Sequence, residues 1–301
     1  MRLRRSELST PASSERMIES AARSAADLVF LDLEDAVAPA EKGAARSRAA
    51  DALRELDWGV RTRAVRINGV DTPYAYRDVI DVVLGAGDAL DVLIVPKVRA
   101  PRDVWWVETL LDQLEAQTGR AEPVALEALV EEAEATTRVE EIARSSSRLE
   151  ALIVGFGDLS ASQGMPPGVL TGGVSYPGDI WHHVRARTVL AARAAGIEAI
   201  DGPYPNFRDG DGYREEAARA RALGFSGKWA IHPSQIALAN DVFSPSDDEV
   251  RAARGVVEAY REAERAGSGA AGLGGALIDA AAVRMMEGTL AKAELIGRRS
   301  G

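Results

Sequence analysis

Two acidic residues follow apolar stretches of the chain, close to the points where those stretches end. Glu131 follows the run ALEALV, and Asp158 follows the run LEALIVG, which stops at Gly155. Two parallel strands joined by a helix point their C-terminal ends the same way, so the sequence predicts that both carboxylates emerge side by side. Two oxygen ligands with no cysteine nearby are typical of a Mg²⁺ site, where water and substrate complete the coordination.

The segment between these two runs predicts a single helix. Its sequence, TTRVEEIARSSS, is amphipathic. Glu127 and Glu132 are interpreted as flanking residues, not as metal ligands.

Polar and charged residues recur at the ends of the other apolar runs as well. In a barrel of parallel strands such positions face the active site. A single acidic residue after a strand is more often a helix cap or a solvated loop residue. Here charged residues follow nearly every strand at the same position, and this recurrence favours a functional site. The expected set is Ser9, Thr10, Glu34, Asp35, Arg66, Asn68, Lys97, Glu131, Asp158, Asp201 and His232.

Three of these residues have alternative roles. Arg66 can pair with a strand-end acid such as Glu34, or clamp a substrate carboxylate in bidentate fashion, and both can hold together. Lys97 could form a Schiff base, although the two carboxylates favour a metal-assisted mechanism. His232 either begins a helix or lines the site. His182 and His183 have no metal-ligand spacing to the carboxylates, and we expect a structural role for them.

Apolar runs alternate with helical patterns along most of the chain, which indicates a parallel sheet covered on both faces. Counting a short run at Ser6–Leu8, there are eight candidate strands, which favours a closed α/β barrel, the (β/α)₈ TIM barrel. The competitor is a doubly wound sheet, which normally has a glycine-rich turn after its first strand. This chain has DLEDAVAP there. The other strands are expected at Leu28–Leu33, Arg63–Ile67, Val92–Val95, in the two runs before Glu131 and Asp158, at Glu198–Ile200 and at Lys228–Ile231.

The C-terminal part predicts a helical extension. We expect a barrel domain over residues 1–245 and an extension over 246–301. A charged helix spans Asp247–Ala266, and the glycine-rich stretch Gly267–Gly275 is interpreted as a flexible connector, since a phosphate loop would follow a strand. The last helical segment is expected at Ala276–Ile296. A helix tethered by glycines suggests a lid that covers a neighbouring subunit's site.

Composition excludes several classes of protein. The 301 residues are 46% hydrophobic and carry a net charge of −10 without a basic block, which argues against nucleic-acid binding. Cations gathered locally can still bind an anionic ligand. The sequence has no cysteine, which removes disulfides, thiolate metal sites and a cysteine nucleophile. With no apolar run of signal-peptide or membrane-span length, we expect a cytoplasmic protein without a membrane partner.

A series of long motifs resembles a known family from about Arg4 to Leu295. They include RRSELSTP, FLDLEDAVAPAEKGAAR, VRINGVDTPYAYRDVID, VPKV, VEEAEATTRVEEIARSSSRLEALIVGFGDL, AIDGPYPNFRDGDGYR, GKWAIHPSQIALANDVFSPS and LIDAAAV. The chain is similar to the HpcH/HpaI aldolase and citrate lyase β-subunit-like CoA lyases, and among them to the malyl-CoA/β-methylmalyl-CoA lyases.

The resemblance implies a Mg²⁺-dependent lyase, with Mn²⁺ as an alternative ion, on a barrel with a C-terminal lid helix. It implies trimers or hexamers, CoA thioester and small α-keto acid substrates, and reversible cleavage of malyl-CoA to acetyl-CoA and glyoxylate. Its metal ligands fall on Glu131 and Asp158, its keto-acid arginine on Arg66, and its acid/base aspartate on Asp279, which serves the neighbouring subunit. The expected substrate-binding residues are Ser9, Thr10, Arg66, Gly157, Ile231 and His232, with Glu34, Asp35 and Lys97 in support.

The resemblance leaves other activities open. A malyl-CoA thioesterase, a citramalyl- or citryl-CoA lyase and a carrier-dependent citrate lyase subunit share the same scaffold. The chain departs from its relatives in two places. An acidic run, Glu132 and Glu134, follows Glu131, and the N-terminal segment has Ser14 and Ser20 where relatives place cations for the CoA phosphates, with Arg16 and Arg23 nearby.

Overall fold

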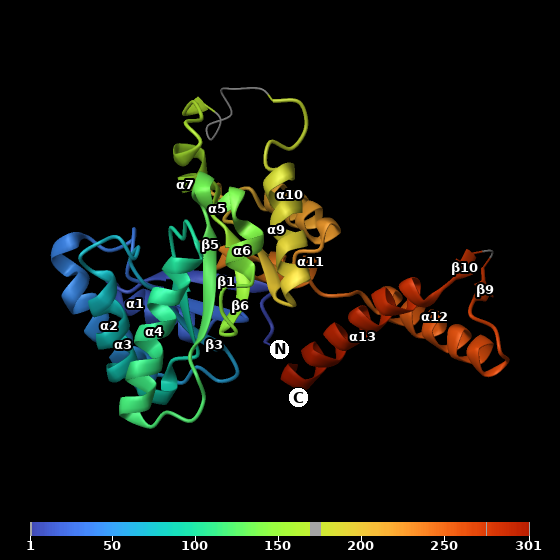
Figure 1. Ribbon diagram of the computed structural model, residues 1–301, viewed down its shortest axis with the longest axis horizontal. Coiled ribbons are helices and arrows are strands. Elements are labelled where there is room, and N and C mark those ends of the chain that lie inside the picture. Colours follow the sequence, from blue (N-terminus) through green and yellow to red (C-terminus); the bar gives the residue numbers. More distant parts are fainter. Residues whose placement is uncertain (1, 169–175, 275, 301) are drawn as a thin grey trace. The chain divides into compact units, whose positions relative to one another are not determined.

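The computed structural model describes residues 2–168, 176–274 and 276–300, which form two compact units, 1–240 and 241–301. In the first unit, parallel strands pair in sequence order and the first pairs with the eighth, which closes a barrel surrounded by helices (Figure 1). The prediction of a (β/α)₈ barrel is confirmed. The strands are β1 (Ser6–Pro11), β2 (Leu28–Asp32), β3 (Thr62–Arg66), β4 (Val92–Val95), β5 (Ala125–Val130), β6 (Leu149–Val154), β7 (Glu198–Asp201) and β8 (Gly227–Ala230).

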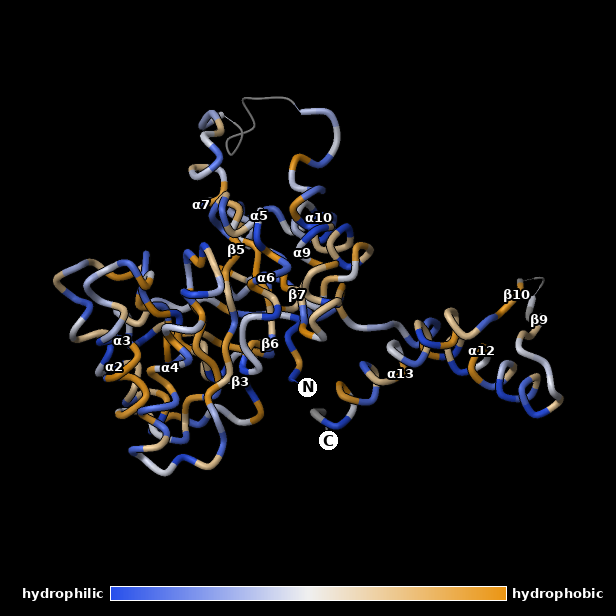
Figure 2. The backbone as a smooth tube through the Cα atoms, in the orientation of Figure 1, coloured by the Kyte–Doolittle hydropathy of each residue, from blue (hydrophilic) through white to orange (hydrophobic). Residues whose placement is uncertain are grey.

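Strand β1 is longer than the sequence predicts. It pairs with β2 from Glu7 opposite Leu28 to Pro11 opposite Asp32, so Ser9 and Thr10 lie inside the strand instead of beyond it. Ser9 and Pro11 flank the strand-favouring Thr10 and do not mark a strand by composition, so here the pairing with β2 decides the conformation. Hydrophobic residues predominate along the barrel strands (Figure 2).

Helices connect the strands over the outside of the barrel. They are α1 (Glu15–Ala22), η1 (Pro39–Glu41), α2 (Lys42–Glu55), α3 (Ala75–Ala86), η2 (Gly87–Ala89), α4 (Pro101–Thr118), α5 (Ala133–Thr137), α6 (Val139–Ala143), α7 (Phe156–Ser162), α9 (His182–Ala195), α10 (Gly210–Leu223) and α11 (Ser234–Val242).

The prediction of one helix between β5 and β6 is wrong, because two short helices, α5 and α6, occupy that connection. Arg138 separates them with φ −123° and ψ 18°, outside the helical range. Thr137 precedes the break, and its hydroxyl donates to the Glu134 carbonyl at 2.8 Å. Threonine is β-branched and bonds to nearby carbonyls, and both properties weaken a helix interior.

The barrel interior is built in three layers. Side chains two residues apart on a strand share a face, so Glu127, Leu129 and Glu131 follow one another along the inner face of β5. Nearest the N-terminal ends of the strands is an ionic layer of Arg4, Glu7 and Glu127. A hydrophobic layer that includes Phe30, Leu129 and Trp229 lies above it. The polar layer at the C-terminal ends contains Asp32, Arg66 and Glu131.

The second unit is a helical hairpin closed by two short strands. It consists of α12 (Asp247–Arg265), β9 (Ala271–Leu273), β10 (Ala276–Ile278) and α13 (Ala280–Ser300). Helix α12 begins with a capping box in which Ser246 and Glu249 exchange hydrogen bonds of 3.2 and 2.7 Å.

Two predictions for this unit are wrong. The glycine-rich stretch contains strand β9 instead of being a connector throughout, and residues 276–278 are strand instead of helix. The two strands pair with Ala271 opposite Ile278, and both residues are buried together with Val257 of α12 and Val283 of α13. This burial holds residues 271–273 of the glycine-rich stretch in a strand. That the unit reaches a neighbouring subunit stays a prediction. Within the described residues, no helix has the length and apolarity that a bilayer crossing demands.

Candidate active site

Arg66 lies at the centre of a charged cluster at the C-terminal ends of the strands. It ends β3 directly opposite Asp32, which ends β2. Nε and Nη2 donate to the two Asp32 oxygens at 2.8 and 2.6 Å, and Nη1 lies 2.8 Å from Glu34 Oε2. The expected pairing with Glu34 is therefore present. A guanidinium has five N–H donors, so donors remain for a substrate carboxylate.

Asp32 is a site residue that sequence reasoning missed. It stands inside the apolar run LVFLDL and reads as part of a core strand. The strand alternation could have identified it. Asp32 lies two residues after Phe30, so both side chains point to the inner face of β2. Its bidentate contact with Arg66 fixes the plane of the guanidinium.

Glu131 follows β5 and is 2% exposed. Its Oε1 accepts a hydrogen bond from the backbone N–H of Lys97 at 2.8 Å. Burial, followed by the negative charges of Glu34 and Asp158, raises the pKa of the Glu131 carboxyl to about 8. The other oxygen, Oε2, packs against Gly155, where an added Cβ would lie 2.3 Å away. Gly155 has φ −108°, a conformation open to any residue, so space alone demands glycine there.

Lys97 connects the carboxylates. Its backbone has φ +52°, the left-handed region that few residues other than glycine adopt. Its Nζ lies 2.7 Å from Glu34 Oε1, 3.5 Å from Asp35 Oδ1 and 3.9 Å from Asp158 Oδ1. Burial alone would lower the pKa of the Lys97 ammonium, but the hydrogen bond and charge of Glu34 outweigh it and raise that pKa. A lysine held in its charged form is a poor Schiff-base nucleophile, so the geometry favours the supporting role.

Asp158 lies in the first turn of α7, and its side chain is 41% exposed. It is close enough to Glu131 for its charge to raise the pKa of that carboxyl. The structure therefore brings together the sequence-predicted residues Glu34, Arg66, Lys97, Glu131 and Asp158 at one rim of the barrel. Asp35 lies at the edge of this group, with its side chain 58% exposed.

A buried lysine braces the loop that carries Glu34. Lys42 Nζ donates to the carbonyls of Leu33 and Glu34 at 2.8 and 3.0 Å and to Asn68 Oδ1 at 2.6 Å. Asn68 in turn donates to Asp78 through its backbone and its side chain. Asn68, expected to face the substrate, is buried and positions the loops after β2 and β3. Lys42 and Asp78 stand within helical patterns, where nothing in the sequence marks them.

The other expected site residues lie in β1, in α7 and after β8, and they are not part of the charged cluster around Arg66. Thr10 is buried near the end of β1 and Ser9 half-buried, while Gly157 is exposed in α7. The Ile231 N–H donates to Gln235 Oε1 at 2.8 Å, and the His232 ring stacks on Phe207 at 4.7 Å. Their contacts with substrate stay predictions.

Asp201 does not belong to the open rim, although its place at the end of β7 suggested it. Its carboxylate is fully buried between Arg185, at 2.9 Å, and Lys228, at 2.6 Å. Both cations also pair with Glu216, so Asp201 is part of a structural ionic cluster.

The acidic run after Glu131 does not add charge beside it. Glu132 Oε1 lies 3.4 Å from Arg99 Nη2, and its Oε2 accepts the Ser162 hydroxyl at 2.9 Å. Glu134 is exposed and lies 3.8 Å from the same arginine. These contacts direct both side chains away from Glu131.

Asp279 belongs to the second unit, where it caps a helix. Its Oδ1 accepts the backbone N–H groups of Ala281 and Ala282 at 3.0 Å, in the first turn of α13. The hydrogen bond from Ala282 in particular lowers the pKa of the Asp279 carboxyl. Its acid/base role in a neighbouring subunit stays a prediction.

The donor set at the rim fits Mg²⁺. Across the described ranges no three His, Asp or Glu residues group closely enough to hold an ion by themselves. Glu131 and Asp158 supply two carboxylates, and Glu131 Oε2 accepts no hydrogen bond from the described part of the chain. A hard cation that takes two carboxylates and completes its shell with water and substrate matches this arrangement.

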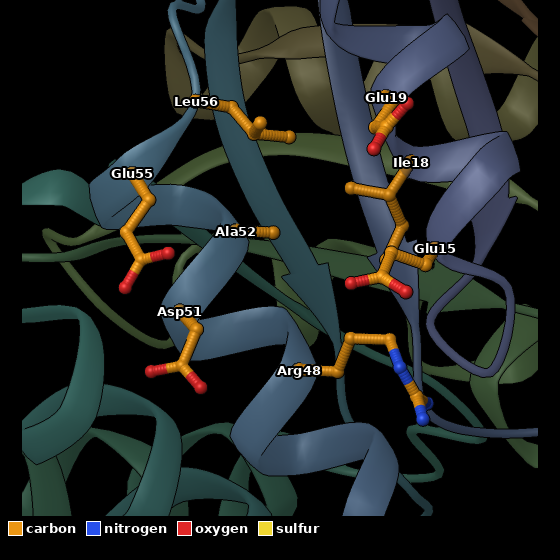
Figure 3. A pocket seen from close by; sticks show the side chains of 8 residues that line it. All are labelled: Glu15, Ile18, Glu19, Arg48, Asp51, Ala52, Glu55 and Leu56. Atoms are coloured by element: carbon orange, nitrogen blue, oxygen red, sulfur yellow. The ribbon is translucent and has the colours of Figure 1, made fainter.

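A separate groove lies between α1 and α2 (Figure 3). Its charged lining consists of Glu15, Glu19, Asp51 and Glu55 with a single cation, Arg48. Arg23, one of the two arginines near Ser14 and Ser20 in the sequence, is exposed and lies 4.0 Å from Glu19. A groove with four carboxylates and one arginine repels phosphate, so it is not the place for an anionic ligand.

Comparison with known proteins identifies the family. Residues 5–233 match the family model described as HpcH/HpaI aldolase/citrate lyase. The chain is 43% identical to L-malyl-CoA/beta-methylmalyl-CoA lyase of Cereibacter sphaeroides, over 97% of this chain and 95% of that protein. It is 39% identical to (3S)-malyl-CoA thioesterase of the same organism, with the same coverage.

Solved structures agree. The protein CitE from Mycobacterium tuberculosis, crystallised with magnesium, acetoacetate and coenzyme A, is 31% identical with a TM-score of 0.74, over 96% of this chain and 97% of that one. The chain belongs to the HpcH/HpaI aldolase/citrate lyase family.

The contact between Gly155 and Glu131 predicts the effect of a single methyl group. Gly155→Ala should displace the Glu131 carboxylate, weaken Mg²⁺ binding by at least about tenfold in calorimetry, and cost about 1–3 kcal/mol of unfolding free energy from overpacking. Gly43→Ala is the matched control. Nothing lies within 4 Å of the added Cβ there, so stability should be unchanged or rise by up to about 1 kcal/mol. A folded Gly155→Ala protein with unaltered Mg²⁺ affinity would contradict the assigned contact.

Proposed function

We propose that this protein is a cytoplasmic, Mg²⁺-dependent carbon–carbon lyase that reversibly cleaves (S)-malyl-CoA to acetyl-CoA and glyoxylate. β-Methylmalyl-CoA would give propionyl-CoA and glyoxylate in the same way. The observation that carries the proposal is the cluster of Arg66, Glu131 and Asp158 at one rim of the barrel. Its support from relatives is the 43% identity to an L-malyl-CoA/beta-methylmalyl-CoA lyase over nearly the whole chain.

Glu131 and Asp158 would hold the Mg²⁺, with Mn²⁺ as an alternative ion. When bound, the ion supplies Lewis acidity toward the oxygens of the 2-hydroxy acid. Lys97 donates its backbone N–H to Glu131 and so fixes that carboxylate, while its ammonium neutralises Glu34. These contacts leave Oε2 of Glu131 as the oxygen that would bind the ion.

Arg66 would bind the carboxylate of the keto-acid half. Because Asp32 takes one bidentate edge of the guanidinium, the remaining N–H groups keep a fixed direction. They hold the substrate carboxylate as the bond between the hydroxyl-bearing carbon and the thioester α-carbon breaks. The hydroxyl proton would pass to the Asp279 carboxylate, the electron pair of the broken bond would pass to the thioester as an enolate, and the hydroxyl carbon would become the carbonyl of glyoxylate.

Asp279 would return a proton to the α-carbon of the enolate, and remove it in the condensation direction. Its lowered pKa keeps the carboxylate ionised at neutral pH, as a base for condensation requires. We infer that it acts in the site of a neighbouring subunit, in a homotrimer or homohexamer. The helical hairpin of the second unit would exclude water, so that the enolate is not lost.

A second candidate is hydrolysis of malyl-CoA. The observation that favours it is the 39% identity to a (3S)-malyl-CoA thioesterase. The two activities need the same recognition of malyl-CoA and differ in whether water reaches the thioester. The products separate them, because hydrolysis gives malate and CoA without glyoxylate.

The test is a Mg²⁺-dependent assay of malyl-, β-methylmalyl-, citramalyl- and citryl-CoA, with glyoxylate, pyruvate, oxaloacetate and free CoA all monitored. We expect glyoxylate and acetyl-CoA from malyl-CoA, and loss of activity with a chelator. Free CoA without glyoxylate would establish the thioesterase instead. No turnover of any thioester, with or without metal, would refute the proposal.

The proton transfer predicts the effect of Asp279→Asn. Asparagine is as good a helix N-cap as aspartate, so α13 should keep its structure. Cleavage should fall by about 10²- to 10⁴-fold, the usual worth of a general acid or base, while CoA-ester binding in calorimetry is retained. Asp247→Asn is the matched control, since it removes an exposed carboxylate from the first turn of α12 in the same unit, and it should be fully active. Full activity of Asp279→Asn would disprove the role.

The raised pKa of Glu131 predicts how Mg²⁺ binding depends on pH. Below a pKa of about 8 the carboxyl is protonated, and the metal must displace that proton. Affinity should therefore rise by about tenfold per pH unit up to pH 8 and then level off. Calorimetry in buffers of different ionisation enthalpy should record the release of about one proton per ion at pH 7. Affinity that stays constant between pH 6 and 8 would show that Glu131 is ionised before the metal binds.

A further inference from the structure

Trp229 is anchored inside the barrel by a hydrogen bond at one end of its ring. It lies in β8 with its side chain in the hydrophobic layer, and it is 5% exposed. Its indole N–H donates to Glu7 Oε2 at 2.9 Å. The Phe30 ring packs against it, with centroids 4.6 Å apart and an angle of 37° between the planes. The hydrogen bond and the aromatic neighbour together fix the orientation of the indole.

The face of this ring lies beneath Arg66. The guanidinium carbon is 5.5 Å from the Trp229 ring centroid and 6.0 Å from that of Phe30. Asp32 and Glu34 hold the guanidinium at its edges, and the two rings support its face. A cation over an aromatic face within about 6 Å is attracted by the ring quadrupole, and most strongly when it is removed from water, as Arg66 is.

Glu7 holds Trp229 from the ionic layer below. It is fully buried beside Glu127, and Arg4 serves both glutamates, with its Nε 2.7 Å from Glu127 Oε1 and 3.9 Å from Glu7 Oε1. Burial and the neighbouring Glu127 charge raise the pKa of the Glu7 carboxyl. A buried carboxyl group is costly unless it is hydrogen-bonded, and a buried indole N–H likewise needs an acceptor, so Glu7 and Trp229 satisfy each other. This mutual hydrogen bond fixes the indole in the position that faces Arg66.

We propose that Trp229, oriented by Glu7, is a positioning residue that holds Arg66 for the carboxylate of the α-keto acid. The chain of contacts runs from Glu7 through the indole N–H to the ring face and on to the guanidinium. It spans all three layers of the barrel interior. The inference rests on the proposed function for the identity of the ligand, and it concerns residues to which the proposed reaction assigns no role.

The test separates recognition of the keto acid from that of the thioester. In the condensation direction, Trp229→Leu should raise KM for glyoxylate by about 10- to 30-fold, the worth of a desolvated cation–π contact, and leave KM for acetyl-CoA unchanged. Trp229→Phe keeps a ring under Arg66 and should have a smaller effect. Glu7→Gln keeps an acceptor for the indole and should behave like the wild type.

A purely structural role gives a different result. If Trp229 only fills the barrel, its variants lower the folded fraction, so kcat falls while both KM values stay constant, and that outcome overturns the proposal. Phe225→Leu is the matched control, because it removes a buried aromatic ring from outside the Arg66 contacts and should cost stability without changing KM for glyoxylate. Trp229→Phe provides the comparison if Trp229→Leu does not fold.

A binding measurement separates this inference from the proposed reaction. Calorimetry with glyoxylate and Mg²⁺ reports keto-acid binding whether or not the thioester turns over. Trp229→Leu should weaken this binding in the otherwise native protein and have no further effect in an Arg66→Met background, because it acts through Arg66. Equal weakening in both backgrounds would overturn the proposal even for an active lyase. If the wild type cleaves no thioester but Trp229→Leu still weakens glyoxylate binding only when Arg66 is present, the proposed lyase reaction is refuted and the positioning role of Trp229 stands.

Discussion

The burial of Arg66 is the constraint on which the rest of the site depends. An arginine with 8% of its surface exposed loses most of its hydration, and only carboxylates in good geometry compensate for that loss. Asp32 satisfies one edge and Glu34 a second position, but Glu34 is then itself buried and needs Lys97. The left-handed backbone of Lys97 directs its side chain to Glu34 while its N–H is donated to Glu131. The burial of one cation, Arg66, thus determines the positions of Asp32, Glu34, Lys97 and Glu131.

The barrel makes this arrangement through the alternation of its strands. Inward positions recur every second residue, so one strand contributes to all three interior layers, as β5 does with Glu127, Leu129 and Glu131. The hydrophobic layer isolates the ionic layer below from the polar layer above. Each layer can therefore keep its own charge balance, and Trp229 connects them through a neutral indole that contacts both.

The sequence could predict the parts of the site that follow from topology. Glu131, Asp158, Arg66 and Lys97 stand at or beyond the ends of apolar runs, and parallel strands bring such positions together. Asp32 and Trp229 could not be assigned in this way. Each lies inside an apolar run whose sequence is also typical of a buried core strand. Its role depends on which strand lies next to it, as Asp32 lies opposite Arg66.

The fold shows the same division between local pattern and tertiary contact. The alternation of strands and helices predicted the barrel, because that pattern is set along the chain. The β9–β10 pair was hidden by its composition. Glycines usually mark a connector, and here the pairing of β9 with β10 and the burial of Ala271 and Ile278 against α12 and α13 form two strands instead.

Charge balance explains where a cation is needed. Asp32 and Arg66 form one neutral pair at 2.6 Å, and Glu34 and Lys97 form a second at 2.7 Å. Asp158 is left with a more distant cation at 3.9 Å, and within the described residues the hydrogen bond to the Glu131 carboxyl group comes from a backbone N–H. Among the residues that the structure describes, the two carboxyl groups of the cluster without a close cation are therefore those at which a divalent ion would bind. Burial leaves one of them to hold a proton until such an ion replaces it, so the raised pKa of Glu131 is the electrostatic counterpart of the proposed metal site.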